Sequence, residues 1–250
     1  MTGEESAVIL IKALETMGVP YMLAGSFSSN FYGISRSTQD ADFVIESRGV
    51  TLAGLQQRLG PAFVVDPQMS FETATGTVRT IITVPEAGFK LELFRLSNDA
   101  HDQERFRRRR SVFVSQLNHN AVLPSPEDVV VFKLRWAVNA GRREDVRDVI
   151  AVQAGFLDWD YICRWTAKHG TRDFLDEILG SIPAKFQTSI PFLPDSSQPS
   201  DIEVSLLAYF DTLSWDYLCD IFSMETVDEY FQFEIQLTRQ RLSSDRKSVV

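Results

Sequence analysis

Residues 21–46 read YMLAGSFSSNFYGISRSTQDADFVIE, and in this stretch two short apolar runs flank a turn of small residues. The first run, 21–24, is predicted to be a strand, and residues 40–45 are predicted to form a second one. Asp40 and Asp42 lie two residues apart at the start of the second strand, so both side chains leave the same face of a sheet. Together they form a candidate platform for a metal ion.

The turn between the strands is Gly25-Ser26, and residues 27–32 can form one or two helical turns. Such a helix directs its first backbone N–H groups toward whatever lies above the turn, which suits an anion. Phosphates at the turn and divalent cations on the two carboxylates are what a nucleoside triphosphate with Mg²⁺ or Mn²⁺ requires, because hard cations bind oxygen ligands.

This stretch resembles the nucleotidyltransferases of the DNA polymerase β superfamily, whose signature is a Gly-Ser or Gly-Gly turn, a helix and an Asp-x-Asp strand. The form Arg36-x-Thr38-x-Asp40-x-Asp42 is similar in particular to the bacterial branch that contains the type IV abortive-infection toxins (AbiEii-like). The resemblance implies a metal-dependent transfer of a nucleoside monophosphate to an acceptor. The nucleotide-binding residues that it implies here are Gly25, Ser26, Arg36 and Thr38.

A second block, 124–150, reads PSPEDVVVFKLRWAVNAGRREDVRDVI. Ser125 followed by Pro126 and Asp128 is typical of a capped helix start. The same family has a Pro-Glu-Asp helix with an internal Lys, followed by Arg-x-Asp-x-x-Asp. By resemblance Lys133 meets phosphate and Asp145 orients either Lys133 or the substrate; the alternative is an ordinary ion pair of small energetic value. The nucleotide-binding residues implied by this block are Lys133, Arg143, Asp145 and Asp148.

The third carboxylate expected of an active enzyme is Glu92, within the predicted strand 89–96. Most active relatives have Asp at this point. Glu is one methylene longer, and a misplacement of about 1 Å can cost roughly a hundredfold in rate. Glu92 is therefore the expected third metal ligand and a catalytic group. The departure from Asp is also a reason to consider the alternative, a non-catalytic binding module with the same fold.

The pattern of the whole chain predicts an α/β fold, a nucleotidyltransferase-type mixed sheet with helices, followed by helices toward the C-terminus. The expected divisions are an α/β domain (1–123), a helical domain that closes the cleft (124–180), a Pro-rich and Ser-rich connector (181–200) and an acidic helical part (201–250). Further helices are expected at 5–17 and 51–59, and further strands at 62–65 and 77–84.

Composition limits the partners. The chain of 250 residues has a net charge of −9 and only two cysteines, and it contains no long apolar run, so a cytoplasmic protein without a membrane span is expected. Arginines 105 and 107–110 could contact RNA or a triphosphate, although a solvated helix face is the favoured interpretation. The acceptor is left open among RNA, protein and a small molecule, and an antitoxin protein is a possible partner of a toxin.

Overall fold

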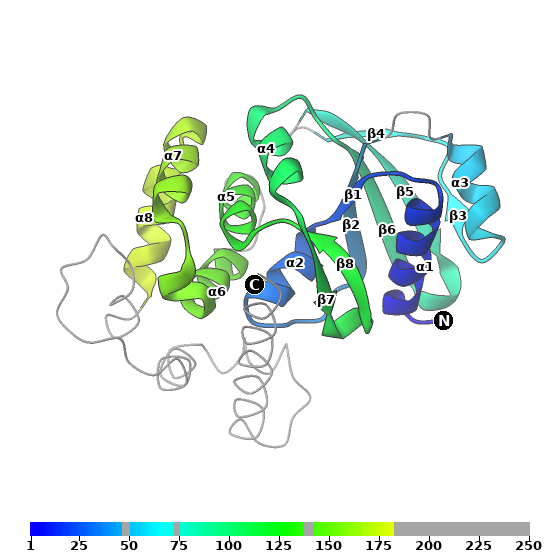
Figure 1. The fold of residues 1–250 in the computed structure, drawn as a ribbon, viewed down its shortest axis with the longest axis horizontal. Helices are drawn as coiled ribbons and strands as arrows, with labels where there is room; N and C mark the ends of the chain where they lie inside the picture. The colour runs from blue at the N-terminus through cyan, green and yellow to red at the C-terminus, as the bar shows by residue number, and fades with distance from the viewer. Residues whose placement is uncertain (47–50, 73–75, 138–142, 183–250) are drawn as a thin grey trace, which may run out of the picture.

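The computed structural model describes residues 1–46, 51–72, 76–137 and 143–182. Its centre is a mixed sheet in which the strands run in the order β1-β2-β6-β5-β3, with β4 also paired to β5 (Figure 1). Only the β2–β6 pair is parallel among these described strands. The strands are β1 (Tyr21–Leu23), β2 (Asp40–Ile45), β3 (Val64–Val65), β4 (Ser70–Glu72), β5 (Thr77–Val84) and β6 (Phe89–Arg95).

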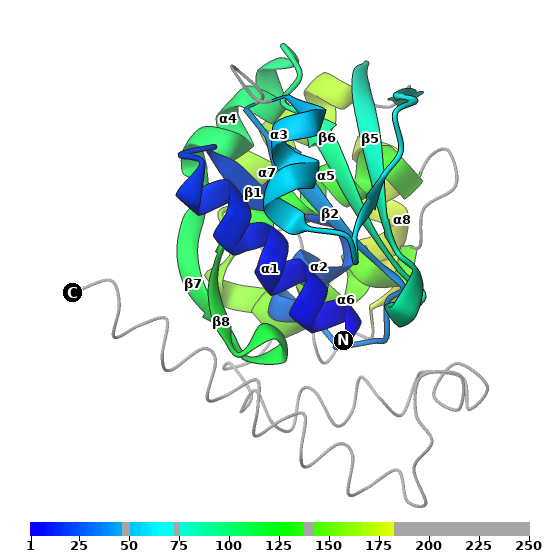
Figure 2. The same cartoon turned by 90° about the vertical axis from the view of Figure 1, so that its right-hand side faces the viewer.

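One face of the sheet is covered by α1 (Gly3–Thr16) and α3 (Leu52–Leu59), as Figure 2 shows. Apolar side chains that alternate along β2 and β6 fill the space beneath them, including Phe43, Leu91 and Leu93. The intervening residues of the same strands face the other way. Asp40, Asp42 and Glu92 belong to this second set, so the sheet separates a dry core from the candidate site.

The helices on the second face are α4 (Ala100–Arg108), α5 (Pro126–Ala137), α6 (Arg143–Gln153), α7 (Trp159–His169) and α8 (Arg172–Ser181), which lie together on the far side of the sheet from α1 (Figures 1 and 2). Helices α5 to α8 share a second apolar core. Tyr32 is the last residue of the helix α2 (Gly25–Tyr32), and Ile34 follows it. Both side chains reach into that core. The segment between β1 and β2 thus connects the sheet to the helices.

The α/β class, the mixed sheet and the helices that follow it are confirmed. Ser125 accepts a hydrogen bond from the Asp128 N–H (3.3 Å), as the predicted cap requires. The hairpin of β7 (Arg110–Val114) and β8 (His119–Leu123) and the short strand β4 are not expected from the sequence pattern. The connector and the acidic C-terminal part lie outside the described residues, except for 181 and 182.

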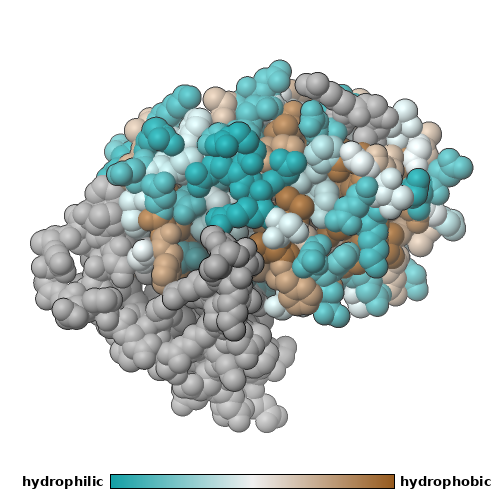
Figure 3. All heavy atoms as spheres, viewed as in Figure 1, coloured by the Kyte–Doolittle hydropathy of each residue, from teal (hydrophilic) through white to brown (hydrophobic). Residues whose placement is uncertain are grey.

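The arginine cluster is not a simple solvated helix face, so that interpretation is wrong for part of it. Arg105 is buried, pairs with Asp102 (2.9 Å) and stacks on Phe132. Arg108 pairs with Asp128 (3.1 Å). The α4 region still forms a hydrophilic area on the surface (Figure 3). These arginines bind neighbouring helices because their guanidinium groups can satisfy several acceptors at once.

Among the helices that the structure describes, none combines the length and the apolar character that a membrane span needs.

Candidate active site

The start of α2 lies directly against the carboxylate of Asp42. Gly25 has a φ of +58°, and a Cβ placed there would lie 1.8 Å from Asp42 Oδ2. The Ala24 N–H donates to the Asp42 carbonyl oxygen (2.8 Å), which fixes the turn to β2. Only glycine permits both the backbone angle and this close approach. The α2 N-terminus has no side-chain cap, so its first N–H groups stay available for an anion.

Three carboxylates gather on one face of two parallel strands. Asp42 and Glu92 are Cα partners in the register of β2 and β6, and Asp40 precedes Asp42 by two residues. The Thr38 hydroxyl donates to Asp40 Oδ1 (2.7 Å), which holds that carboxylate in one orientation. The sheet therefore brings together three acids that sequence reasoning grouped, and it adds a reason for Thr38 to be present.

The electrostatics of Asp42 are unusual for an acid. Burial, and then the negative charges of Asp40 and Glu92, raise the pKa of Asp42 to about 7, although Lys133 and Arg79 act in the opposite direction. Crowded carboxylates resist ionisation in this way until a cation or a proton compensates them. A bound divalent cation would provide that compensation.

Glu92 forms an ion pair with a residue that no sequence motif indicated. Arg79 on β5 donates from Nη1 to Glu92 Oε2 at 2.7 Å, and the two side chains are mostly buried. Over the described residues, no three acidic, histidine or cysteine side chains converge closely enough to hold a metal ion. The third carboxylate is thus in the site but turned toward a guanidinium.

A network of three charged side chains, Arg36, Lys133 and Asp145, lies beside the α2 N-terminus. Asp145 on α6 accepts two hydrogen bonds from Arg36 (both 3.0 Å) and one from Lys133 Nζ (2.7 Å). Arg36 also donates to Ser26 Oγ (3.0 Å). Burial alone would raise the pKa of Asp145, but the bonds from Arg36 and the charge of Lys133 outweigh it and lower the pKa to about 2. Asp145 therefore stays ionised and sets the position of both cations beside the α2 N-terminus.

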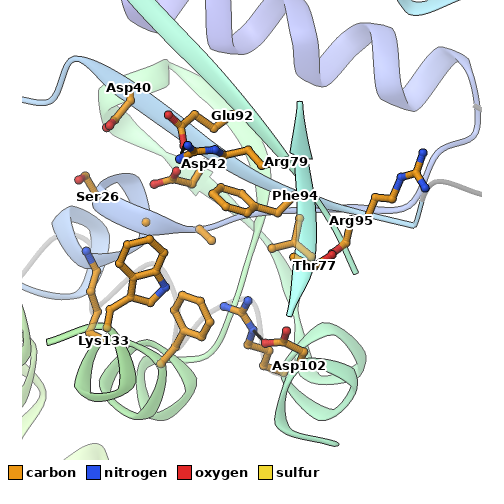
Figure 4. A pocket seen from close by; sticks show the side chains of 16 residues that line it. Ser26, Asp40, Asp42, Thr77, Arg79, Glu92, Phe94, Arg95, Asp102 and Lys133 are labelled. Atoms are coloured by element: carbon orange, nitrogen blue, oxygen red, sulfur yellow. Dashed lines mark hydrogen bonds and ion pairs between the residues drawn. The ribbon is translucent and has the colours of Figure 1, made fainter. Parts of the chain in front are cut away.

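A cavity of about 280 Å³ lies between the sheet and α4 and α5 (Figure 4), and among the site residues described above its lining includes Ser26, Asp40, Asp42, Arg79, Glu92 and Lys133. The acids and Ser26 lie at one end, and Asp102 lies at the other. Aromatic side chains form part of the wall, and no motif in the sequence marked them. The lining residues that sequence reasoning missed include Thr77, Arg79, Phe94, Phe132 and Trp136, whereas Arg105 belongs to the arginine cluster considered above.

Five of the eight expected nucleotide-binding residues do not line this cavity: Arg36, Thr38, Arg143, Asp145 and Asp148. Arg143 pairs with Glu177 on α8 and lies over the Phe174 ring, with its cation 4.4 Å from the ring centroid. Asp148 is buried on α6, 3.6 Å from Arg147 Nε. Arg36, Lys133 and Asp145 do come together with the turn at Ser26, although Arg36 and Asp145 are 109 positions apart in the chain.

The residues present fit a divalent cation. Mg²⁺ in nucleotide sites is usually held by one or two carboxylates together with phosphate oxygens and water, rather than by a cage of protein ligands alone. Asp40 and Asp42 supply two hard oxygen ligands on one face, beside a helix N-terminus that suits phosphate. Burial and the two neighbouring carboxylates raise the pKa of Asp42, and a bound cation would favour its ionised form.

Comparison with known proteins yields distant structural similarities. No protein-family profile and no curated protein sequence match the chain. The antibiotic-resistance factor ANT(2'')-Ia is 12% identical, with a TM-score of 0.44 and 70% of this chain and 94% of that one covered. An antigenic nucleotidyltransferase-like protein from Paracoccidioides brasiliensis is 18% identical (TM-score 0.42; 71% and 92% covered). JHP933 from Helicobacter pylori is 12% identical (TM-score 0.42; 99% and 94% covered). The likeness is to nucleotidyltransferase-type structures and is remote.

Proposed function

We propose that this protein is a metal-dependent nucleotidyltransferase. The observation that carries the proposal is the close contact between Gly25, at the uncapped start of α2, and Asp42, on the strand that also carries Asp40. This arrangement puts an anion-binding backbone directly beside two hard oxygen ligands. A nucleoside triphosphate with a divalent cation satisfies both features at once.

Each residue has a role that follows from its contacts. Asp40 and Asp42 would hold Mg²⁺ or Mn²⁺, which when bound neutralises phosphate charge and polarises the phosphorus that is attacked. The turn at Gly25-Ser26 would receive the outer phosphates. Lys133 and Arg36, held in place by Asp145, would neutralise the charge that grows on pyrophosphate as it leaves.

In the transfer itself an acceptor oxygen forms a bond to the α-phosphorus, and the bond from that phosphorus to pyrophosphate breaks. The proton of an acceptor hydroxyl has to go to a base, and Glu92 is the carboxylate proposed to accept it. Arg79 Nη1 donates to Glu92 Oε2 at 2.7 Å, which orients the carboxylate of Glu92.

The acceptor class rests only on the resemblance of the Arg36-x-Thr38-x-Asp40-x-Asp42 segment to the AbiEii-like branch. RNA or a protein is the acceptor that this resemblance favours, and a small molecule is the alternative. A toxin role would come with a small DNA-binding antitoxin encoded beside this protein. Incubation with labelled nucleoside triphosphate and either total RNA or cell protein would distinguish the two macromolecular acceptors.

A second candidate is a non-catalytic module that binds a nucleotide. The observation that favours it is the hydrogen bond from Arg79 to Glu92, because a carboxylate oxygen that already accepts from a guanidinium is less available to a metal ion or to an acceptor hydroxyl. This candidate predicts nucleotide binding with no turnover for any acceptor. Turnover with any one acceptor would exclude it.

The test is calorimetric titration of each of the four nucleoside triphosphates, with and without Mg²⁺, into the full chain and two variants. Asp42→Asn removes a proposed metal ligand, and Asp160→Asn is the matched control, because Asp160 is exposed on α7 and far from the cavity lining. Magnesium-dependent binding that is lost in Asp42→Asn and kept in Asp160→Asn supports the proposal. Equal binding in all three proteins would remove it.

A further inference from the structure

Arg79 reaches Glu92 from β5, acts on Asp42 through its charge, and is held by several contacts. Its Nη1 donates to Glu92 Oε2 (2.7 Å) and its Nε donates to Ser70 Oγ on β4 (3.2 Å). Its guanidinium carbon lies 5.8 Å from the centroid of the Phe94 ring. A charge-assisted hydrogen bond from a side chain held in this way is well ordered, unlike a typical surface ion pair. Arg79 is therefore a permanent cation of the cavity.

The position of this cation matters because of what it faces. Figure 4 shows Arg79 beside both Glu92 and Asp42, with a dashed line to Glu92. Sites that use two metal ions hold them about 3.5–4 Å apart and need carboxylates that can reach both. Here one oxygen of Glu92 is already bound to a guanidinium, and over the described residues the acids do not converge as a group of three.

We infer that Arg79 takes the place of a second metal ion, so that the site holds one divalent cation per nucleotide, on Asp40 and Asp42. The inference rests on the proposed function. Two physical reasons support it: Arg79 withdraws Glu92 from the ligand set, and its positive charge repels a second divalent cation at the same end of the cavity.

The alternative is that the pair only joins β5 to β6 and opens when nucleotide and metal arrive. In that case Glu92 would rejoin Asp42 and two ions would bind. The two possibilities differ in a number that can be counted without any turnover, namely the metal ions bound per nucleotide.

The experiment counts Mn²⁺ by electron paramagnetic resonance of the free ion, at saturation with the α,β-methylene analogues of the four nucleoside triphosphates. The wild type is expected to bind one Mn²⁺ per bound nucleotide. Arg79→Gln, which removes the charge and frees Glu92, is expected to bind a second Mn²⁺ at least about tenfold more tightly than the wild type does. Two ions in the wild type, or no second ion in Arg79→Gln, would overturn the inference.

Two variants separate charge from position. Arg95→Gln removes another cation from the cavity lining, but Arg95 is exposed and contacts Met69 (3.8 Å) instead of a carboxylate, so one ion is still expected. Adding Glu92→Gln to Arg79→Gln should abolish the second ion, because the freed ligand is then gone. A second ion in Arg95→Gln would show that any cation of the cavity has this effect, and a second ion in the double variant would show that Glu92 is not the ligand that Arg79 withholds; either result would refute the inference.

A separate variant tests the proposed function. If Asp42→Asn binds nucleotide and Mn²⁺ as the wild type does, the metal site itself is elsewhere and the proposed function fails. If Asp42→Asn loses the ion but the wild type holds two, only the role of Arg79 fails. The wild-type count needs no substitution, so the inference can be decided even if Arg79→Gln does not fold, which urea denaturation will show.

Discussion

Gly25→Ala gives a direct test of the packing between the α2 turn and β2. The new methyl carbon would lie 1.8 Å from Asp42 Oδ2 and 2.7 Å from its Cγ, whereas ordinary contact begins at 3.4 Å. The carboxylate must therefore move away by roughly 1.5 Å, and a misplacement of that size at a reacting centre costs about a hundredfold or more in rate. The left-handed φ of +58° adds about 1–2 kcal/mol of strain for any residue with a Cβ.

Gly88→Ala is the matched control for the strain. Gly88 has nearly the same φ, +59°, and no described atom lies within 4 Å of its added Cβ. Urea denaturation should show a loss of about 1–2 kcal/mol for Gly88→Ala and a larger loss for Gly25→Ala. Most of the excess should disappear when Asp42→Ala is combined with Gly25→Ala, because the truncated side chain leaves room for the methyl group.

Binding of Mg²⁺ with nucleoside triphosphate should follow the same order. Calorimetry is expected to show binding unchanged in Gly88→Ala and strongly weakened in Gly25→Ala. If the two alanine variants lose equal stability and bind equally well, Asp42 does not lie against Gly25, and the site geometry derived above is incorrect.

Three further outcomes are expected. The pKa of Asp42 is raised from 3.8 to about 7, so the folded state binds a proton there that the unfolded chain releases; the stability from this group is full below about pH 4 and is lost as pH rises toward 7. Urea denaturation with a chelator should therefore show Asp42→Asn gaining stability relative to the wild type as the pH rises from about 4 to about 7. Asp145→Asn leaves the two cations that Asp145 bridges, Arg36 and Lys133, without a compensating charge. The free energy of unfolding should fall by about 3 kcal/mol in the same assay. A loss under about 1 kcal/mol would contradict the network. Tyr161→Phe removes the hydroxyl that donates to buried Asp128 and should cost about 1.5–3 kcal/mol, which thermal unfolding can measure; an unchanged melting temperature would show that this bond contributes nothing.

The sequence determined the features that depend on local backbone geometry. Alternation with a period of two put Asp40 and Asp42 on one face of a strand, and it identified β5 and β6 within one residue of their observed ends. Ser125 before Pro126 marked the start of α5 because a cap uses only neighbouring residues. The sequence indicates a tight turn at Gly25, but the close approach of Asp42 that requires glycine there is visible only in the structure.

Only the tertiary structure decided which distant residues meet. Arg79 faces Glu92 because β5 and β6 pair with a particular register, and Arg36 meets Asp145 because α6 packs against the segment that joins α2 to β2. The same packing places Arg143 beside α8 rather than in the cavity. Such contacts depend on the burial of apolar faces far apart in the chain, and no local pattern encodes that choice. The acids of the site can thus be predicted from the sequence, whereas the cations that pair with them are brought there by the fold.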